Sequence, residues 1–487
     1  MGQSKNFSKR ILVPVSDPVG VWQRARWRSR TAPRAAVLAA WVAVCGLFAA
    51  PPARADATRG DAQIDAIVKE LSARRIEITI RKLAGFETRH TLSETDSETR
   101  GIGAARRWIK AELDQCSKAS GGRLKVEFDE FVAEPGPRIP KPATLINIVA
   151  TLPGAQAESR DRIYVVSGHY DSMPSDVMDP RSAAPGANDD ASGTAAVMEI
   201  ACVMSHYKFD ATLVFMAVAG EEQGLVGSTH WARQAKQKGL NIAGMITNDI
   251  IGSSHAEDGT VVADRVRLFA EGVPAAKEIG DDLRTLLRTG GENDTPTRQL
   301  GRFVKETAER HVPGMKVDLI YRRDRYLRSG DHFPFLEEGF PALRFTEPNE
   351  DFRHQHQNVR KENGVQYGDL PEFVDFAYVA NVARVNVAAL AALALGPAAP
   401  REVQVETVKL ENDTTLRWRA NTEPDMAGYR LLWRDTTAAF WQGAKDVGNV
   451  TRYTLKGLSK DNLIFAVQAI DKDGNASVAS YPRPYRP

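Results

Sequence analysis

Three short blocks rich in His, Asp and Glu stand out in the sequence, and each lies beside an apolar run. They are VVSGHYDS at 165–172, PGANDDASG at 185–193 and VFMAVAGEEQG at 214–224. Imidazole nitrogens and carboxylate oxygens are zinc ligands, and two zinc ions bridged by a carboxylate can clamp a hydroxide and polarise a carbonyl. The neighbouring Glu221 and Glu222 offer a metal ligand and a general base side by side. The pattern therefore predicts a hydrolytic metal centre.

The apolar runs indicate which elements must position these blocks. The run at 163–167 is typical of a buried strand that ends just before His169, and the run at 211–219 is typical of another that ends just before Glu221. Between them, 191–204 has the pattern of a helix entered through the second block. Loops at the carboxyl ends of parallel strands line one crevice, so we expect the three blocks to meet there.

The alternation of strands and helices continues to a long Ala/Val-rich helix at 373–395. It predicts an α/β domain at 56–396 with a mostly parallel central sheet and helices on both faces. After a linker at 397–400, short alternating segments separated by turn residues indicate an all-β sandwich. Trp418 and the closing FAVQAIDKDGNAS resemble a fibronectin type III domain, which we place at 401–487. A chain of 487 residues is long enough for two such domains.

The N-terminal segment has the features of an export signal. Several Arg residues precede an apolar run at 35–50, and Ala53-Arg54-Ala55 fits a small-x-small cleavage site. We predict a signal peptide at 1–55 and a periplasmic or secreted protein that is free of the membrane once the signal is cleaved. A retained signal anchor is the alternative, although the apolar run is short for a membrane span.

The remaining composition excludes several classes of site. Cleavage of the signal leaves Cys116 and Cys202, which are too few for a Cys-based metal site. In an oxidising compartment they either form one disulfide or stay as thiols, and the sequence leaves both open. A net charge of +2 gives no sign of a nucleic-acid partner.

The order of the blocks resembles the di-zinc exopeptidase family of secreted bacterial leucine aminopeptidases and aminopeptidase Y. Relatives of that family include glutamate carboxypeptidase II and glutaminyl cyclase, and the resemblance covers about residues 80–395. It implies two zinc ions held by His169, Asp189, Glu222, Asp249 and His356. It also implies that Glu221 is the general base and that Asp171 orients the imidazole of His169.

The match offers two candidates for the last metal ligand. In the family it is a His that follows a G-x-P-A segment, which here is 339–342, and both His354 and His356 in FRHQHQNVR qualify. The stretch departs from the family's His-Thr-Pro-x-Asp-Thr pattern. We prefer His356 because the family often places a Gln just before this residue, as here.

Other polar residues near the blocks receive structural interpretations. Asp190 is interpreted as an acceptor that stabilises its loop. Asp331-His332, with Gly330 where the family often has Ser, is interpreted as a structural and pocket element. Four arginines lie just before it, and we favour a solvated basic surface over a site for a substrate carboxylate or acidic side chain: Arg322, Arg323, Arg325 and Arg328. The substrate pocket is expected from the region 253–326.

The favoured hypothesis is an exported zinc aminopeptidase that hydrolyses the N-terminal bonds of peptide or protein substrates. A carboxypeptidase or a glutaminyl cyclase of the same fold is the first alternative. Cyclases of the family tend to lack the full Glu-Glu block, which this chain keeps. The second alternative is a non-catalytic binding protein, but such relatives typically lose ligands or the general base, and here every position is filled. The sequence leaves the oligomeric state open.

Overall fold

The computed structural model describes residues 59–274 and 280–485, which belong to one compact unit, Asp56–Pro487. The predicted signal peptide at 1–55 lies outside the described residues, so export stays a prediction.

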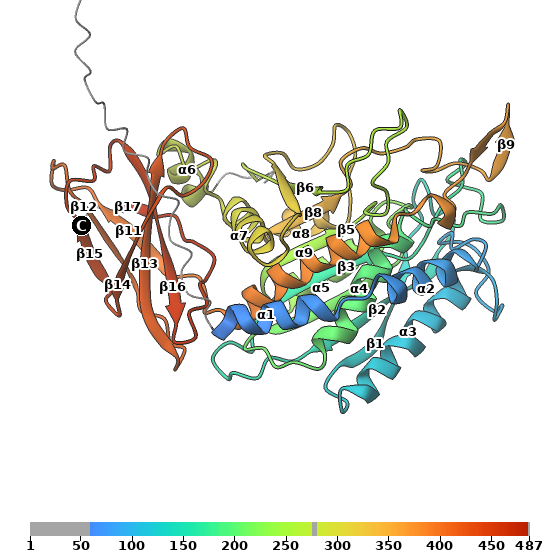
Figure 1. Ribbon diagram of the computed structural model, residues 1–487, viewed down its shortest axis with the longest axis horizontal. Coiled ribbons are helices and arrows are strands. Elements are labelled where there is room, and N and C mark those ends of the chain that lie inside the picture. The colour runs from blue at the N-terminus through green and yellow to red at the C-terminus, as the bar shows by residue number, and fades with distance from the viewer. Residues whose placement is uncertain (1–58, 275–279, 486–487) are drawn as a thin grey trace, which may run out of the picture. The chain divides into compact units, whose positions relative to one another are not determined.

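Helices and strands alternate along most of the chain before the linker (Figure 1). The helices are α1 (Arg59–Glu70), α2 (Ala73–Ala84), α3 (Gly101–Ala119), α4 (Ala191–Met204), α5 (Val226–Gln237), α6 (Asp281–Arg288), α7 (Pro296–His311), α8 (His332–Glu337), η1 (Pro371–Phe373) and α9 (Phe376–Leu395). The strands are β1 (Lys125–Ala133), β2 (Ala143–Leu152), β3 (Arg162–His169), β4 (Thr212–Val218), β5 (Asn241–Asn248), β6 (Arg265–Ala270), β7 (Lys316–Ile320), β8 (Ala342–Thr346), β9 (Arg360–Glu362) and β10 (Val365–Tyr367).

An eight-stranded mixed sheet lies at the centre of this part, with the order β1-β2-β4-β3-β5-β8-β6-β7 (Figure 1). The central strands β4, β3, β5 and β8 run parallel, while β2 is antiparallel to β4 and β6 is antiparallel to β8. Every residue of β4 is buried, as expected of a parallel strand covered on both faces. The carboxyl ends of β3, β4 and β5 therefore meet at one edge of the sheet.

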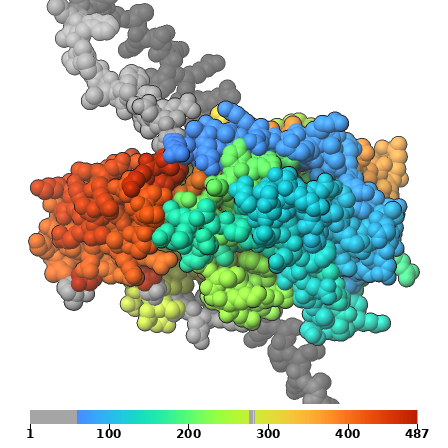
Figure 2. All heavy atoms as spheres, turned by 90° about the horizontal axis from the view of Figure 1, so that it is seen from below, coloured from blue at the N-terminus to red at the C-terminus, as the bar shows by residue number. Residues whose placement is uncertain are grey.

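Helices cover both faces of the sheet, as predicted. The larger apolar core joins one face to α1, α2, α3, α4, α7 and α9, and a smaller core joins the other face to α5 and α8. Among the described residues, α9 alone has the length and hydropathy of a membrane span, but 83% of that window is buried, as in a core helix. Figure 2 shows the blue and cyan residues of α1–α3 on the outer surface.

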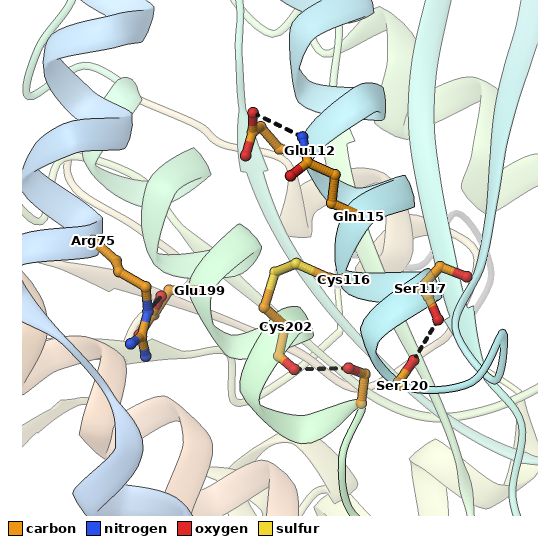
Figure 3. The surroundings of a disulfide bond; sticks show 9 residues. Arg75, Glu112, Gln115, Cys116, Ser117, Ser120, Glu199 and Cys202 are labelled. Atoms are coloured by element: carbon orange, nitrogen blue, oxygen red, sulfur yellow. Dashed lines mark hydrogen bonds and ion pairs between the residues drawn. A yellow bond between two sulfur atoms is a disulfide. The ribbon is translucent and has the colours of Figure 1, made fainter.

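A disulfide bond joins Cys116 on α3 to Cys202 on α4 (Figure 3). Beside it, the buried carboxylate of Glu199 on α4 accepts hydrogen bonds from the guanidinium group of Arg75 and from the backbone N–H of Ser72. These contacts tie α2 and α3 to α4. Because α4 begins at the second acidic block, they also fix the helix that carries this block.

The residues after the linker form two further sheets. The strands are β11 (Arg401–Glu406), β12 (Thr414–Arg419), β13 (Met426–Asp435), β14 (Gly443–Gly448), β15 (Arg452–Leu455), β16 (Leu463–Asp471) and β17 (Arg483–Tyr485). They are ordered β15-β12-β11-β17 and β14-β13-β16, and they enclose a core that includes Leu416, Trp418 and Phe465. The region is all-β; its assignment as a fibronectin type III domain stays a prediction.

Candidate metal centre

The residues predicted to bind metal follow the carboxyl ends of neighbouring parallel strands. His169 is the last residue of β3, Glu222 lies in the turn after β4, and Asp249 directly follows β5. Asp189 comes from the loop that enters α4, just before the N-cap residue Asp190. This is the edge at which open α/β sheets place their ligands.

Two glycines allow α4 to begin against the ends of these strands. A Cβ atom on Gly168 would lie 2.5 Å from the carbonyl carbon of Gly193, and one on Gly193 would lie 2.2 Å from the carbonyl oxygen of Asn248. A side chain at either position would push α4 away from β3 and β5. The glycines of the first two blocks are therefore needed to bring Asp189 beside His169.

Asp189 lies between two groups of candidate metal ligands. Its Oδ1 atom is 3.1 Å from Nε2 of His169, and the same Nε2 is 3.8 Å from Oδ1 of Asp249. Its Oδ2 atom is 2.9 Å from Nε2 of His356, which is 3.1 Å from Oε1 of Glu222. In each group the ligand atoms lie within 4.8 Å of one another. Asp189 thus contributes one carboxylate oxygen to each of the two groups of candidate ligands.

Of the two candidate histidines, the structure brings His356 into the centre. His354 instead stacks on Phe373, with 3.7 Å between the ring centroids, and its Nδ1 atom is 3.7 Å from Asp351. The single residue between the two histidines also reaches the centre, because the side-chain amide of Gln355 donates a hydrogen bond of 3.1 Å to Asp189.

The hydrogen bonding and electrostatics of the centre fit a cation. Nε2 of His169 is buried, and no residue in the described ranges 59–274 and 280–485 forms a hydrogen bond of good geometry with it. Burial alone would lower the pKa values of His169 and His356, but the surrounding carboxylates raise both pKa values well above the usual value. The centre thus attracts positive charge, and its imidazole and carboxylate donors suit zinc.

Glu221 borders the centre without belonging to either ligand group. Burial raises the pKa of its carboxyl group well above the usual value, and the negative charges of Asp249 and Glu222 oppose the effect of His169. A buried carboxyl group next to a metal site is a candidate general base and acid. The structure therefore gives the two neighbouring glutamates different surroundings.

Asp171 contacts His169 differently from the arrangement implied by the resemblance. Nδ1 of His169 is 3.2 Å from the main-chain oxygen of Asp171 and 3.6 Å from its carboxylate. The carboxylate accepts hydrogen bonds from the hydroxyl of Thr91 at 2.9 Å and from the N–H groups of Glu221 and Glu222 at 3.3 and 3.2 Å. Asp171 thus orients the imidazole mainly through its backbone and positions the glutamate pair through its side chain.

Asp190 has the surroundings of a loop-stabilising acceptor. Its Oδ2 atom accepts a hydrogen bond of 3.0 Å from the N–H of His169, and its Oδ1 atom accepts one of 3.0 Å from the N–H of Gly193. The second of these bonds caps α4. The side chain therefore links the end of β3 to the start of α4.

Two buried residues that the sequence did not single out hold the loop before α4. The guanidinium group of Arg89 donates hydrogen bonds to the carbonyl oxygens of Tyr170 at 2.7 Å and Gly186 at 2.9 Å. The carboxylate of Asp369 accepts a hydrogen bond of 2.7 Å from the N–H of Asp189. Burial lowers the pKa of Arg89 to about 10 and raises the pKa of Asp369 to about 7.

The interpretation of the arginines as a solvated surface is wrong for Arg323, Arg325 and Arg328. The side chain of Arg323 is 22% exposed, and its Nε atom lies 3.4 Å from the buried Glu271. The side chain of Arg325 is only 11% exposed, because its Nη1 atom is 2.8 Å from Glu350 and its Nε atom is 3.1 Å from Asp324. Nη1 of Arg328 lies 2.6 Å from Glu350. Arg325 and Arg328 belong to a buried ion-pair network that we call the arginine cluster: Arg267, Arg325, Arg328, Arg344, Asp324 and Glu350.

Arg344 connects the arginine cluster to the metal centre. Its guanidinium group lies 3.2 Å from Asp324 and 2.9 Å from the metal-ligand candidate Asp249. A Cβ atom on Gly330 would lie 2.7 Å from Nη1 of Arg344, so the glycine at this position leaves room for the contact. The adjacent Asp331 is fully buried, and burial raises its pKa to about 7.

A cavity of about 280 Å³ opens onto the metal centre. Four of its lining residues have left-handed backbones: Leu225 (φ 60°), Ile250 (φ 62°), Leu327 (φ 55°) and His356 (φ 51°). Residues other than glycine rarely adopt this conformation, and such strain concentrates at functional sites. The described residues of the expected pocket region 253–326 contribute only Arg325 to this cavity. The other lining residues come from elsewhere in the described chain.

The fold and the site together define a metal-dependent hydrolase with a mixed α/β sheet. Comparison with known proteins identifies its family: residues 147–367 match the family model of peptidase family M28. The chain is 48% identical over 422 residues to a probable zinc metalloprotease of Leptosphaeria maculans, covering 87% of this chain and 97% of that protein. It is 47% identical over 425 residues to a probable zinc metalloprotease of Pyrenophora tritici-repentis, covering 87% of each. The chain belongs to peptidase family M28 and is a zinc metallopeptidase.

Among solved structures, the Legionella pneumophila LapA aminopeptidase aligns with a TM-score of 0.47 at 21% identity, covering 69% of this chain and 75% of that one. The Fimbriiglobus ruber glutaminyl cyclase aligns with a TM-score of 0.44 at 19% identity, covering 66% of this chain and 95% of that one.

Proposed function

We propose that this zinc metallopeptidase is an aminopeptidase that removes N-terminal residues from peptides. The observation that carries the proposal is the position of Asp189, whose two carboxylate oxygens face two separate ligand groups beside the free carboxyl group of Glu221. This arrangement suits hydrolysis with two metal ions. The intact Glu-Glu block supports aminopeptidase chemistry over cyclisation, because cyclases with this fold tend to lack it.

In the proposed mechanism, His169, Asp189 and Asp249 would hold one zinc ion, while Asp189, Glu222 and His356 would hold the other. When bound, the two ions supply a water molecule of lowered pKa and polarise the scissile carbonyl group. Glu221 lines the same cavity and takes the proton from the attacking water, then passes it to the leaving amine. Asp171 keeps Glu221 in place through the N–H group of that residue.

Export is part of the proposal. It is supported by the Arg-rich, apolar N-terminal segment with its small-x-small site. It is also supported by the bond between Cys116 and Cys202, because disulfides form and persist mainly in oxidising compartments.

A substrate panel with and without a chelator tests the proposed function. The panel pairs free-amine aminoacyl anilides with N-blocked peptides. We expect hydrolysis of the free-amine substrates only, loss of this activity with the chelator, and its return with zinc. Cleavage of N-blocked peptides from the C-terminus would replace the proposal with a carboxypeptidase. Cyclisation of N-terminal glutamine without peptide hydrolysis would replace it with a glutaminyl cyclase.

A further inference from the structure

Arginine residues from separate segments of the chain help to line the cavity at the metal centre. Arg138 reaches it from the loop between β1 and β2, while Arg325 and Arg328 come from the segment between β7 and α8. Arg138 donates one hydrogen bond of 2.6 Å to the main-chain oxygen of Glu222, so it lies directly beside the metal centre.

These arginines have hydrogen-bond donors that find no partner among the described residues. Arg328 uses Nη1 for Glu350, and its Nε and Nη2 atoms have no partner among the described residues. The Nε–Nη2 edge is one of the forks with which arginine binds a carboxylate through two parallel hydrogen bonds. Nη2 of Arg325 and the Nε–Nη2 edge of Arg138 likewise have no partner in the described parts of the chain.

The charges of the arginine cluster do not balance. Its four guanidinium groups pair with Asp324 and Glu350 and, through Arg344, with Asp249 of the metal centre, which leaves a surplus of one positive charge. The side chains of the cluster are between 1% and 31% exposed, so water screens this surplus only in part. A partly buried surplus of charge is stabilised by an opposite charge with good hydrogen-bond geometry.

We propose that the free fork of Arg328, supported by Arg325 and Arg138, binds a carboxylate group of the substrate within this cavity. The inference rests on the proposed peptidase function and adds a substrate class to it: peptides that carry a carboxylate close to the scissile bond. That carboxylate belongs either to an acidic side chain or to the C-terminus of a very short peptide. Both sources present the same planar group to the same fork.

Two matched substrate pairs separate these sources. The first pair is glutamyl and glutaminyl 4-nitroanilide, which differ in the charge of the side chain. The second is leucyl-leucine and its C-terminal amide, which differ in the charge of the terminus. For the zinc-loaded protein, we expect kcat/KM of the charged member of one pair to exceed that of its amide partner by about tenfold or more, because hydrogen bonds to charged groups are worth that much.

Variants of Arg328 test the residue itself. Arg328→Gln should bring the charged-to-amide ratio close to one, and Arg328→Lys should restore it only in part, because lysine keeps the charge but lacks the fork. Arg322→Gln is the matched control: Arg322 lies in the same segment, is exposed and does not line the cavity, so its variant should keep the wild-type ratio. A ratio taken within each variant is insensitive to a general loss of activity.

Calorimetric binding of the same substrate pairs to zinc-loaded protein carrying Glu221→Gln gives a readout that does not need turnover. The charged member of a pair should bind more tightly than its amide partner, and this difference should disappear when Arg328→Gln is added to Glu221→Gln. That result would support the carboxylate site even if the anilides are not cleaved. Cleavage of the neutral substrates with a wild-type ratio near one would overturn the site while the aminopeptidase proposal stands. A high ratio that Arg328→Gln leaves unchanged would overturn it as well.

Discussion

Two groups of buried carboxylates, connected through Arg344, differ in what balances their charge. In the arginine cluster, Asp324 and Glu350 are each within 3.2 Å of at least two guanidinium groups. In the metal centre, Asp189 and Glu222 face the imidazole of His356, and no Lys or Arg of the described residues forms an ion pair with either.

The pKa values of one glutamate from each group, Glu350 and Glu222, show the same contrast. Burial opposes ionisation in both groups, but arginines lower the pKa of Glu350 to about 2, whereas the pKa of Glu222 remains raised. A carboxylate cluster that already has its cations serves mainly to hold the fold, while one without them needs a bound ion to be stable in its charged form. The absence of a guanidinium partner therefore sets Asp189 and Glu222 apart from Asp324 and Glu350 among the described residues, whereas Asp249 shares Arg344 with the arginine cluster.

The largest expected effect separates the two neighbouring glutamates of the metal centre. Glu221→Gln should lower kcat by about 10²–10⁴-fold, because it removes the general base. Zinc content should stay at the wild-type level, since Glu221 belongs to neither ligand group. Glu222→Gln should instead lower the zinc content, because it removes a ligand.

Zinc content after dialysis, measured by atomic absorption, and kcat on a free-amine anilide are compared for both variants. Zinc loss in the Glu221 variant, with zinc retained in the Glu222 variant, would mean that the two roles are exchanged.

A smaller effect is expected in the arginine cluster. Glu350→Gln leaves Arg267, Arg325 and Arg328 without their shared carboxylate, which is only 5% exposed. Removing one partner of such a buried network should lower the free energy of unfolding by about 3–5 kcal/mol. Urea denaturation of the chelator-treated protein measures this without a contribution from bound metal.

The matched control for this variant is Glu362→Gln. Glu362 pairs with Arg360 on the β9–β10 hairpin and is 56% exposed, so its loss should cost less than about 1 kcal/mol. Equal effects of the two substitutions would show that the buried cluster is not a structural network.

Much of the fold could be predicted because its central elements are long and apolar. The expected strand at 163–167, strand at 211–219 and helix at 191–204 correspond to β3, β4 and α4. The short strand β8 was not predicted, because its Arg344 interrupts the apolar pattern. That arginine is buried only because Asp324 and Asp249 balance it, and neither lies near β8 in the sequence.

The candidate site likewise has residues that the sequence predicts and residues that it does not. Three of the five proposed ligands, His169, Asp189 and Glu222, are marked by short motifs, and the structure brings all five together. Arg89 and Asp369 carry no such mark, because they act through backbone groups that are distant in the sequence; Asp369 bonds to an N–H group 180 residues away. Arg325 and Arg328 looked like a solvated surface because their carboxylate partner, Glu350, follows 25 and 22 residues later.

The smallest effect concerns the dependence of stability on acid. Against the effect of burial, the arginines bring the pKa values of Asp324 and Glu350 down to about 2. In the unfolded chain these groups titrate near about pH 4. The folded-state pKa is therefore the lower one, so the stabilisation is fully present above about pH 4 and is lost as the pH falls through the folded-state value. Between these limits, protonation of each group should lower the free energy of unfolding by about 1.4 kcal/mol for every pH unit by which the pH falls.

Urea denaturation of chelator-treated protein between about pH 2.5 and about pH 6 measures this slope. In the Glu350→Gln variant only Asp324 remains, so we expect this part of the slope to fall by about half. Removing metal beforehand separates the effect from protonation of the metal ligands, which weakens zinc binding in the same pH range. An unchanged slope in the variant would show that the arginines do not hold Glu350 in its ionised form, and the electrostatic contrast between the two carboxylate groups would then fail at this residue.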